Sequence, residues 1–491
     1  MLKNIYLPLK LQARKTAATA TASTAQIKSS KRKVKVELDE KIRQQILNDE
    51  LKPKKQPGTA HQVALHLPEW LCKAVRTLGS ETCMPSFEDE ILVLHRYLHS
   101  RQPPSYQAHV QKKFSEIIKE LTERVDFEAV TSENMEEIEN KIEVDAHTKL
   151  KQSVYNWQPI EYTYQKGLTY LIARGGHNYA ALYTILSEIK KRDPSFIPKT
   201  LFDFGSGVGS VSWVAMTLWP KSIKEYLGIE ISEPMMKLAQ KIINMSDTPI
   251  QNVFFKQYFP VASPSYDLIV SAFSLLELPT RRNRMETVLN LWRKTARYLV
   301  IVEEGTTAGF AIINEVREFF LRVVKSHTEK GMYKAFIFAP CPHQLPCPMF
   351  QTRDTACKFN ASFFALPYWK MKKNHVLNTQ FTYIVLKKGS DKTEEDEWPR
   401  LVQPVLKGSK RAICRMCTAE GNLQEITFTK SKHERPLFRC ARKSHLGDRL
   451  PIKIFNDVNA SETSDNLEMN DEELNSDNDD YDDDEEPIDK K

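Results

Sequence analysis

The 491-residue sequence contains only eight cysteines. A chain of this length with so few cysteines does not belong to the small secreted scaffolds that disulfides hold together. It also lacks any run of about 18 or more uncharged apolar residues, so neither a transmembrane helix nor a membrane partner is expected. At this length we expect two or three domains with a sizeable core.

Acidic residues are absent from residues 1–36, which contain nine Lys or Arg and many Ala, Ser and Thr. Apolar residues lie among the basic ones roughly as in an amphipathic helix, which Pro8 interrupts. This composition predicts a mitochondrial transit peptide over residues 1–36. A disordered basic arm that binds nucleic acid or a nuclear receptor, helped by Lys31, Arg32 and Lys33, is the alternative.

The other end of the chain is acidic, because residues 459–491 contain 15 Asp or Glu and two Lys. Such a segment cannot bury enough apolar surface to fold, so we expect a disordered acidic tail. The whole chain carries +7 and this tail −13, which leaves +20 on residues 1–458. A basic body favours polyanionic partners, of which nucleic acid is the commonest.

The hydrophobic periodicity divides the rest of the chain into three regions. Residues 37–165 are expected to be helical, and apolar residues recur every three or four positions in residues 68–78, 86–101 and 110–127, and again in residues 168–192 at the start of the next region. From residue 199 onward, short apolar segments alternate with helical ones, which predicts a doubly wound α/β sheet over residues 166–390. Residues 391–458 are basic and alternate in EITFTK and PIKIF, so we expect a small separate β-rich module.

A glycine-rich turn follows the first expected strand, in FDFGSGVGS. Its acidic residue and glycines would lie at the carboxyl end of that strand, where glycine lets the backbone turn sharply and approach a ligand; they are Asp203, Gly205, Gly207 and Gly209. Glu230 ends the second expected strand, where a carboxylate accepts hydrogen bonds from ribose hydroxyls. This spacing alone does not separate NAD from S-adenosylmethionine.

Three details favour S-adenosylmethionine. Asp203 precedes the glycines and can meet the methionine ammonium group. GIEISEPMMKLA resembles the second-strand segment of class I methyltransferases, and YDLIVSAFSLLEL resembles their fourth-strand segment. We therefore predict a class I, Rossmann-like methyltransferase fold that binds this cofactor through Asp203, the three glycines and Glu230.

No catalytic group for methyl transfer is identified. The Asn/Asp-Pro-Pro-aromatic segment of amino-group methyltransferases is replaced here by SAFSLLEL. Cysteine is absent from residues 84–340, so the loop after the fourth strand has no thiolate nucleophile of the kind that cytosine-C5 methyltransferases use. Ser274 and Glu277 are the polar candidates, and we expect them to shape the pocket.

Six of the eight cysteines lie between residues 341 and 440, which predicts metal or cluster ligation before disulfides. One arrangement is a tetrahedral zinc site on Cys414, Cys417, Cys440 and either His445 or His433. The other is a four-thiolate iron–sulfur site on Cys341, Cys347, Cys357 and one of Cys414 or Cys417. The prolines of PCPHQLPCP would stiffen its loop. Spacing alone leaves both arrangements open.

Two segments are strongly basic. Residues 281–298 carry six Lys or Arg, and residues 401–458 carry twelve against five Asp or Glu, with Phe428 and Phe438 interleaved. Phosphate contacts with occasional aromatic stacking are typical of RNA binding. We expect RNA at the C-terminal module and a solvated face on the helix at 281–298.

Several segments occur together and in order, namely LFDFGSGVGSVSW, GIEISEPM, SAFSLLELP, LVIVEEGTTAGF, CPHQLPCP, CKFNASF, WPRLVQPVLK and RCARKSHLGD. Through them the chain resembles the mitochondrial small-ribosomal-subunit methyltransferase-like family from about residue 160 to 455. The resemblance implies a matrix assembly factor of the mitochondrial small ribosomal subunit, which contacts rRNA and not DNA. It also implies a bound S-adenosylmethionine, a structural [4Fe-4S] cluster and little or no methyltransferase activity. The alternative is an active S-adenosylmethionine-dependent methyltransferase of small-subunit rRNA.

The resemblance also implies a ligand set. Cys341 and Cys347 match the CPH…CP pair, and Cys357 matches the cysteine of the C-x-F segment. The fourth ligand of the family precedes an acidic-Gly turn, here CTAEG, which implies Cys417 before Cys414. This ligand set argues against the zinc arrangement. It also implies that His343 is a neighbour of the cluster and not a ligand.

Overall fold

The computed structural model describes residues 34–80, 87–103, 107–124, 135–153, 158–260, 264–329, 334–352, 355–366, 375–389 and 392–456. The acidic tail lies outside these ranges, and so does the predicted transit peptide except for residues 34–36. No helix in the described ranges is both long and apolar enough to cross a membrane. The larger compact unit of the chain, Glu37–Lys453, contains every site considered below.

Eight strands form the central sheet, in the order β4-β3-β2-β5-β6-β9-β7, with β8 also paired to β9. Strands β2 to β6 are parallel, whereas β9 runs antiparallel to β6, β7 and β8. Their bounds are β2 (Thr200–Phe204), β3 (Glu225–Ile229), β4 (Asn252–Lys256), β5 (Tyr266–Ala272), β6 (Thr295–Glu304), β7 (Ala335–Ala339), β8 (Phe359–Phe364) and β9 (Val376–Lys388). An antiparallel strand inserted before the last strand of the doubly wound order 3-2-1-4-5-6 gives the class I methyltransferase arrangement, so the predicted fold is confirmed.

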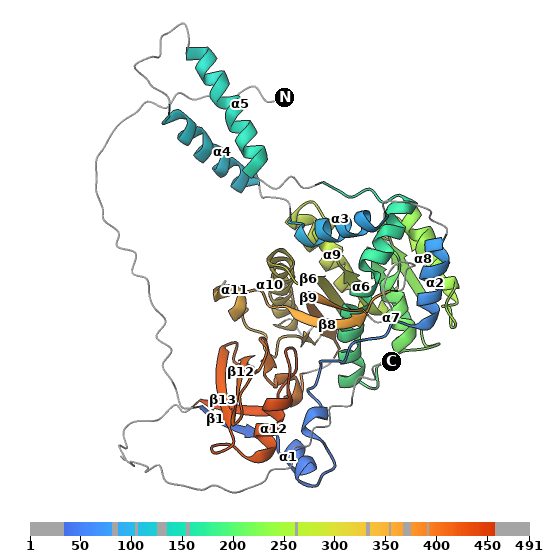
Figure 1. Ribbon diagram of the computed structural model, residues 1–491, viewed down its shortest axis with the longest axis vertical. Helices are drawn as coiled ribbons and strands as arrows, with labels where there is room; N and C mark the ends of the chain where they lie inside the picture. Colours follow the sequence, from blue (N-terminus) through green and yellow to red (C-terminus); the bar gives the residue numbers. More distant parts are fainter. Residues whose placement is uncertain are drawn as a thin grey trace, which may run out of the picture. The chain divides into compact units, whose positions relative to one another are not determined.

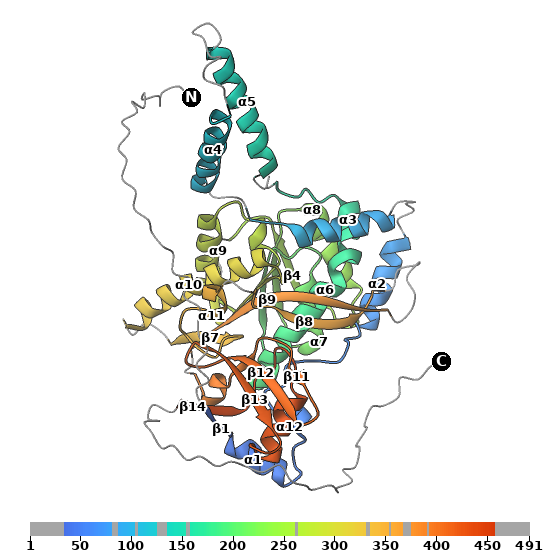
Figure 2. The ribbon, with the colours of Figure 1, turned by 60° about the vertical axis from the view of Figure 1, so that its left-hand side comes forward.

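Helices cover both faces of this sheet (Figures 1 and 2). One face forms a core with α2 (Glu69–Ser80), α6 (Tyr164–Arg192), α7 (Ser210–Leu218) and α8 (Glu233–Asn244). The other face forms a core with η3 (Leu275–Glu277), α9 (Arg281–Lys294) and α10 (Thr307–Glu329). Because the centres of β5 and β6 are buried on both faces, they carry continuous apolar runs, at residues 268–270 and 298–302.

The helical N-terminal region is present. The predicted helices at 68–78, 86–101, 110–127 and 168–192 correspond to α2, α3 (Phe87–Ser100), α4 (Gln107–Thr122) and α6. Three further elements lie within the predicted helical region without having been singled out, namely α1 (Glu40–Leu47), η1 (Pro53–Lys55) and α5 (Met135–Ser153). Strand β1 (Val34–Leu38) pairs with β14 (Ile452–Asn456), so β1 crosses the boundary predicted between residues 36 and 37.

The C-terminal module is β-rich, as predicted. Strand β12 pairs with β10 and β11 on one side and with β13 on the other. The elements are η4 (Glu394–Glu397), β10 (Arg400–Leu401), β11 (Leu406–Lys407), β12 (Arg411–Cys417), β13 (Leu423–Thr429) and α12 (Arg435–Lys443). These residues belong to the same compact unit as the central sheet.

Candidate functional site

The predicted glycine turn joins β2 to α7 at the carboxyl edge of the sheet. Gly205, Gly207 and Gly209 have φ values of 70°, 53° and 86°, which lie in the left-handed region. A Cβ atom at position 205 would lie 2.4 Å from the Cβ of Ser274. Glycine is therefore required at 205 for both its backbone angle and its contact with the loop after β5.

Glu230 follows β3 and braces this turn. One carboxylate oxygen accepts a hydrogen bond from the Gly207 amide at 2.9 Å, and the other accepts one from the Ser232 amide at 2.9 Å. Burial raises the pKa of Glu230, although these amide hydrogen bonds oppose the shift. A carboxylate has about four acceptor positions, so Glu230 keeps capacity for the hydroxyls of a ribose.

Asp203 is 1% exposed, and its Oδ2 accepts a hydrogen bond of 2.9 Å from the Tyr226 hydroxyl. Its Oδ1 has no hydrogen-bond partner among the described residues. Burial, assisted by the charge of Glu230, raises the pKa of Asp203 to about 7, and the Tyr226 hydrogen bond opposes this rise. A buried acceptor without a partner beside a glycine turn fits the ammonium group of S-adenosylmethionine.

Residues 158–164 contact the loops at this edge of the sheet, which the sequence analysis did not predict. Arg101, 1% exposed at the end of α3, donates to the Gln158 carbonyl at 2.8 Å and to Glu277 at 2.6 Å. The Ser232 hydroxyl donates to the Tyr162 carbonyl at 2.9 Å. The segment is therefore joined through Arg101 to the loop after β5 and through Ser232 to the loop after β3.

The side chains of Ser274 and Glu277 both form polar contacts with other residues of the chain. The Ser274 hydroxyl lies 2.7 Å from the Ser271 hydroxyl and donates to the Phe204 carbonyl at 3.1 Å. Glu277 forms the ion pair with Arg101. The Ser274 hydrogen bond joins the loop after β5 to the end of β2, and the Glu277 ion pair joins that loop to the end of α3. The pocket-shaping role of both residues stays a prediction.

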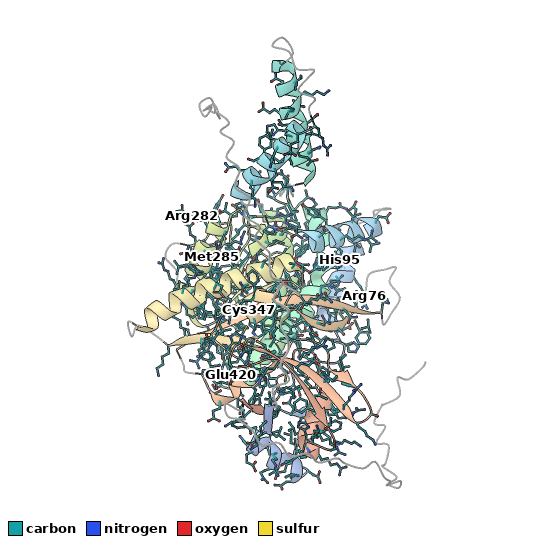
Figure 3. The ribbon with its side chains drawn as sticks, turned by 90° about the vertical axis from the view of Figure 1, so that its left-hand side faces the viewer. Arg76, His95, Arg282, Met285, Cys347 and Glu420 are labelled. Atoms are coloured by element: carbon teal, nitrogen blue, oxygen red, sulfur yellow. The ribbon has the colours of Figure 1, made fainter. Side chains whose placement is uncertain are left out.

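Four of the cysteines come together from separate parts of the chain. Cys341 and Cys347 precede α11 (Pro348–Thr352), Cys357 precedes β8, and Cys417 ends β12. Cys347, Cys357 and Cys417 meet in one apolar cluster. Burial raises the pKa of Cys357 and of Cys417 well above the usual value, and the neighbouring Cys341 and Cys347 thiols raise both further. Figure 3 marks Cys347 and, in the turn after β12, Glu420.

Cys414 does not belong to this group. The Cys417 Sγ lies 3.3 Å from the His343 Nε2 of the cysteine loop, whereas the Cys414 Sγ points to the Ala441 carbonyl of α12 at 3.9 Å. Residues three apart on a strand lie on opposite faces, so β12 presents only Cys417 to the loop. The choice of Cys417 over Cys414 as a ligand stays a prediction.

The zinc arrangement is not assembled in the described residues. Cys414 and Cys417 face opposite sides of β12. His433 accepts a hydrogen bond from the Thr429 amide through its Nδ1 at 3.1 Å, and the His445 ring contacts the His61 ring at a tilt of 43°, with ring centroids 3.8 Å apart. The two histidines therefore have other partners.

Two buried guanidinium groups lie beside the four thiols. Arg317 of α10 contacts His343 Nδ1 at 3.3 Å and the Leu345 carbonyl. Burial lowers the pKa of Arg317, but Cys341 and Cys347 raise it more, so the net shift is upward. Arg400 donates to the Pro340 carbonyl at 2.8 Å. Positive charge at this position stabilises an anionic set of thiolates, and the donor set therefore fits a four-cysteine cluster.

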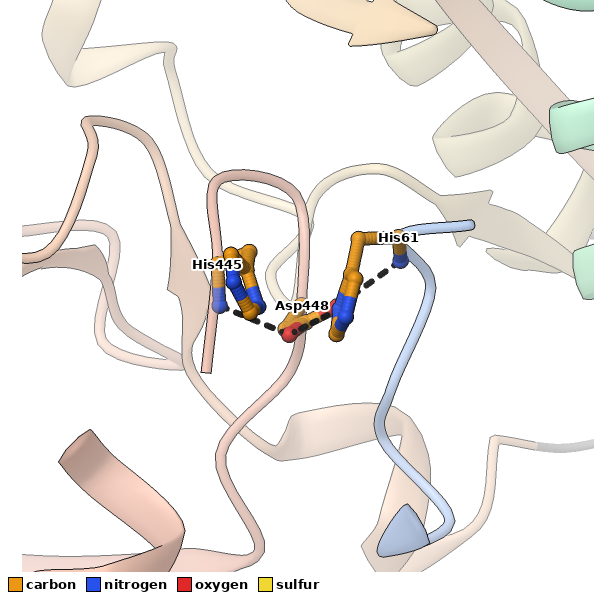
Figure 4. Close-up of side chains that lie close together, drawn as sticks. All are labelled: His61, His445 and Asp448. Carbon is orange, nitrogen blue, oxygen red and sulfur yellow. Dashed lines mark hydrogen bonds and ion pairs between the residues drawn. The ribbon is translucent and has the colours of Figure 1, made fainter. Parts of the chain in front are cut away.

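A group of three metal-ligand side chains within 4.8 Å of one another occurs elsewhere, at His61, His445 and Asp448 (Figure 4). Asp448 is completely buried, and its carboxylate accepts hydrogen bonds from the amides of Ala60, His61 and His445 and from the His61 ring. These bonds use the acceptor capacity of the carboxylate. The group is therefore better described as a clamp between residues 58–61 and the loop after α12.

The two aromatic residues interleaved with the basic C-terminal residues are not available for stacking. Phe428 is 0% exposed and Phe438 is 3% exposed. Both contribute to the core between α12 and β12–β13, so the stacking that the sequence suggested at these rings is wrong. Most basic residues of the module are exposed, but Arg400 and Arg449 are buried.

Comparison with known proteins gives three kinds of similarity. The human mitochondrial ribosome assembly protein METTL17 is 36% identical over 402 residues, which are 81% of this chain and 85% of that protein. The fission yeast mitochondrial Rsm22-cox11 tandem protein 2 is 26% identical over 331 residues, which are 58% of this chain and 43% of that protein.

Among solved structures, magnesium protoporphyrin IX methyltransferase from Synechocystis with bound SAM is 14% identical, with a TM-score of 0.27 over 48% of this chain and 88% of that chain. The plantazolicin methyltransferase BpumL in complex with SAH is 13% identical, with a TM-score of 0.23 over 43% of this chain and 83% of that chain. Finally, residues 164–451 match the family described as mitochondrial small ribosomal subunit Rsm22.

Proposed function

Because the chain belongs to the Rsm22 family, we propose that it is an assembly factor of the mitochondrial small ribosomal subunit. It acts in the mitochondrial matrix and binds rRNA through its basic C-terminal module. It binds S-adenosylmethionine at Asp203, Gly205, Gly207, Gly209 and Glu230, and a structural [4Fe-4S] cluster at Cys341, Cys347, Cys357 and Cys417. Methyl transfer is not its main task.

The observation that carries this proposal is the meeting of the four thiols. Cys341, Cys347 and Cys357 come from the end of the central sheet, and Cys417 comes from the C-terminal module. Cysteines about 60 positions apart are thus neighbours that could supply one donor set, beside the cations Arg317 and Arg400. When bound, a [4Fe-4S] cluster supplies four iron–thiolate bonds across this junction. Its position away from the glycine turn supports a structural role.

The glycine turn supports cofactor binding independently of the cysteines. Asp203 Oδ1 would accept from the methionine ammonium, and Glu230 would accept from the ribose hydroxyls. The Gly207 amide, already oriented by Glu230, fixes the turn in the conformation that approaches a ligand. This pocket also supports the second candidate, an active methyltransferase of small-subunit rRNA, and an experiment must separate the two.

Rescue of small-subunit assembly in cells that lack the protein separates them. One variant carries Glu230→Ala, which removes the proposed ribose contact, and the other carries Cys341→Ser with Cys347→Ser. We expect the Glu230 variant to restore assembly and the cysteine variant to fail. If a folded Glu230 variant that no longer binds S-adenosylmethionine also fails, the methyltransferase is the better description.

Iron content distinguishes the proposed ligands with a matched pair of variants. Cys417→Ser and Cys414→Ser change two buried thiols on the same strand, and only the first faces the cysteine loop. Anaerobically purified Cys417→Ser should lose most of the iron and sulfide of the unchanged protein, while Cys414→Ser should keep both. If the wild-type protein contained zinc but no iron or sulfide, the proposal of an iron–sulfur cluster would be contradicted.

A further inference from the structure

The outward face of α12 carries a regular row of basic side chains. Arg435, Arg439 and Lys443 follow one another at four-residue intervals, and all three are exposed. Residues spaced by four lie on the same face of a helix, so the row extends roughly 12 Å at about 1.5 Å per residue. The opposite face of α12 is buried, including Leu437 and Cys440, which fixes the orientation of the row.

Like charges crowd at one end of this row. Burial lowers the pKa of Lys407 on β11, and the nearby charges of Lys443 and Arg442 lower it further. Such repulsion is unfavourable in the protein alone and is relieved when a polyanion binds. The exposed ion pairs of the module, Arg415–Glu425 and Lys453–Glu394, employ other basic residues.

The row offers charge without aromatic stacking. The one aromatic residue of α12, Phe438, is buried, and so is Phe428 of β13. Proteins that bind single-stranded nucleic acid combine a basic groove with exposed rings on which the bases stack. Duplex RNA is instead recognised largely through its phosphates and 2′-hydroxyls. A purely ionic row on a straight helix therefore suits the backbone of a duplex.

From these observations we propose that the α12 row, Arg435, Arg439 and Lys443, binds the sugar–phosphate backbone of a double-stranded RNA segment. The proposal rests on the proposed rRNA-binding function and specifies both the surface and the form of RNA. Each phosphate contact contributes about 0.9 to the slope of log affinity against log salt by analogy with duplex DNA. Loss of all three contacts should therefore reduce the magnitude of that slope by roughly 3.

The test compares two triple variants of the full chain. Arg435→Gln, Arg439→Gln and Lys443→Gln remove the row, while Lys112→Gln, Lys113→Gln and Lys119→Gln remove the same charge from exposed positions on α4. Fluorescence anisotropy measures binding to a labelled RNA duplex and to an unstructured single strand of equal length, at several salt concentrations. Unchanged thermal melting confirms that each variant is folded.

We expect tighter binding of the duplex by the unchanged protein, and a weaker affinity and shallower salt slope only in the α12 variant. An equal loss in the α4 variant, or no loss in the α12 variant, would overturn the assignment of the surface and leave rRNA binding intact. If the protein preferred the single strand and this preference depended on the α12 row, the assignment of duplex RNA as the ligand would be overturned. If the unchanged protein bound neither RNA, both this inference and the proposed rRNA binding would fail.

Discussion

Replacement of Arg400 by methionine is expected to destabilise the protein strongly. Arg400 is 2% exposed and joins three parts of the chain. Its guanidinium donates to Glu188 of α6 at 2.5 and 3.1 Å, to the Pro340 carbonyl at 2.8 Å and to the Gly447 carbonyl at 2.8 Å. Methionine fills much of the same space but leaves a buried carboxylate and two carbonyls without this partner.

The size of the expected loss of stability depends on the partners that Glu188 keeps. Removing one member of a buried ion pair costs about 3–5 kcal/mol, because the other charge stays buried. Glu188 keeps a hydrogen bond of 2.7 Å from Arg192 and one of 3.1 Å from the Tyr383 hydroxyl. These remaining contacts offset part of the loss, so we expect the lower end of the range, about 3 kcal/mol.

The same pair predicts a pH dependence. Burial raises the pKa of Glu188, but Arg400 and Arg192 lower it more, and the net pKa lies below the usual value of 4.5. A carboxyl with a lowered folded-state pKa adds stability above its unfolded pKa and loses it as the pH falls through the folded one. The difference in the free energy of unfolding between the wild-type protein and Arg400→Met should therefore be largest at neutral pH and become smaller in acid.

Urea unfolding followed by tryptophan fluorescence measures this difference, with Arg415→Met as the control. Arg415 belongs to the same module but pairs with Glu425 at the surface, where an ion pair contributes about 0–1 kcal/mol. The double variant Glu188→Gln with Arg400→Met should recover part of the loss, because it removes the uncompensated charge. A loss below about 1 kcal/mol in Arg400→Met, or one equal to the control, would refute the reasoning.

Two further predictions concern single carboxyl groups. Because the pKa of Asp203 is about 7, S-adenosylmethionine should bind more tightly as the pH rises from 6 to 8, and Asp203→Asn should abolish this dependence in calorimetric titration. Asp448→Asn should lower the free energy of unfolding by about 1–3 kcal/mol, because an amide nitrogen replaces one acceptor of the clamp. An affinity for S-adenosylmethionine that does not change between pH 6 and 8 would contradict the first prediction. An unchanged free energy of unfolding in Asp448→Asn would contradict the second.

The features that the sequence predicts well are local ones. The glycine turn and Glu230 each follow an apolar strand directly, so their place at the carboxyl edge of the sheet is fixed by chain connectivity. The class I fold follows from the same alternation of strands and helices. The sheet edge could thus be predicted because few long-range contacts are needed to define it.

The features that sequence reasoning missed depend on contacts between distant residues. Arg101 meets Glu277 across 176 positions, and nothing in the sequence around either residue indicates this pair. Cys414 and Cys417 are equivalent by spacing, and only their opposite faces on β12 distinguish them. Phe438 lies among arginines in the sequence but faces the core, because α12 turns one side inward.

The junction at the cysteines is stabilised in several ways besides the proposed cluster. Arg400 bonds to Glu188 of α6, and Asp448 clamps residues 58–61, where Lys191 of α6 also donates to the Thr59 carbonyl at 2.7 Å. A Cβ atom on Gly58 would lie 2.0 Å from the Arg449 carbonyl oxygen, so this segment fits tightly against the loop after α12. Since these contacts involve no cysteine, loss of the cluster should leave the C-terminal module attached. The cluster's effect on structure is then concentrated in residues 340–357, which three of its four proposed ligands share.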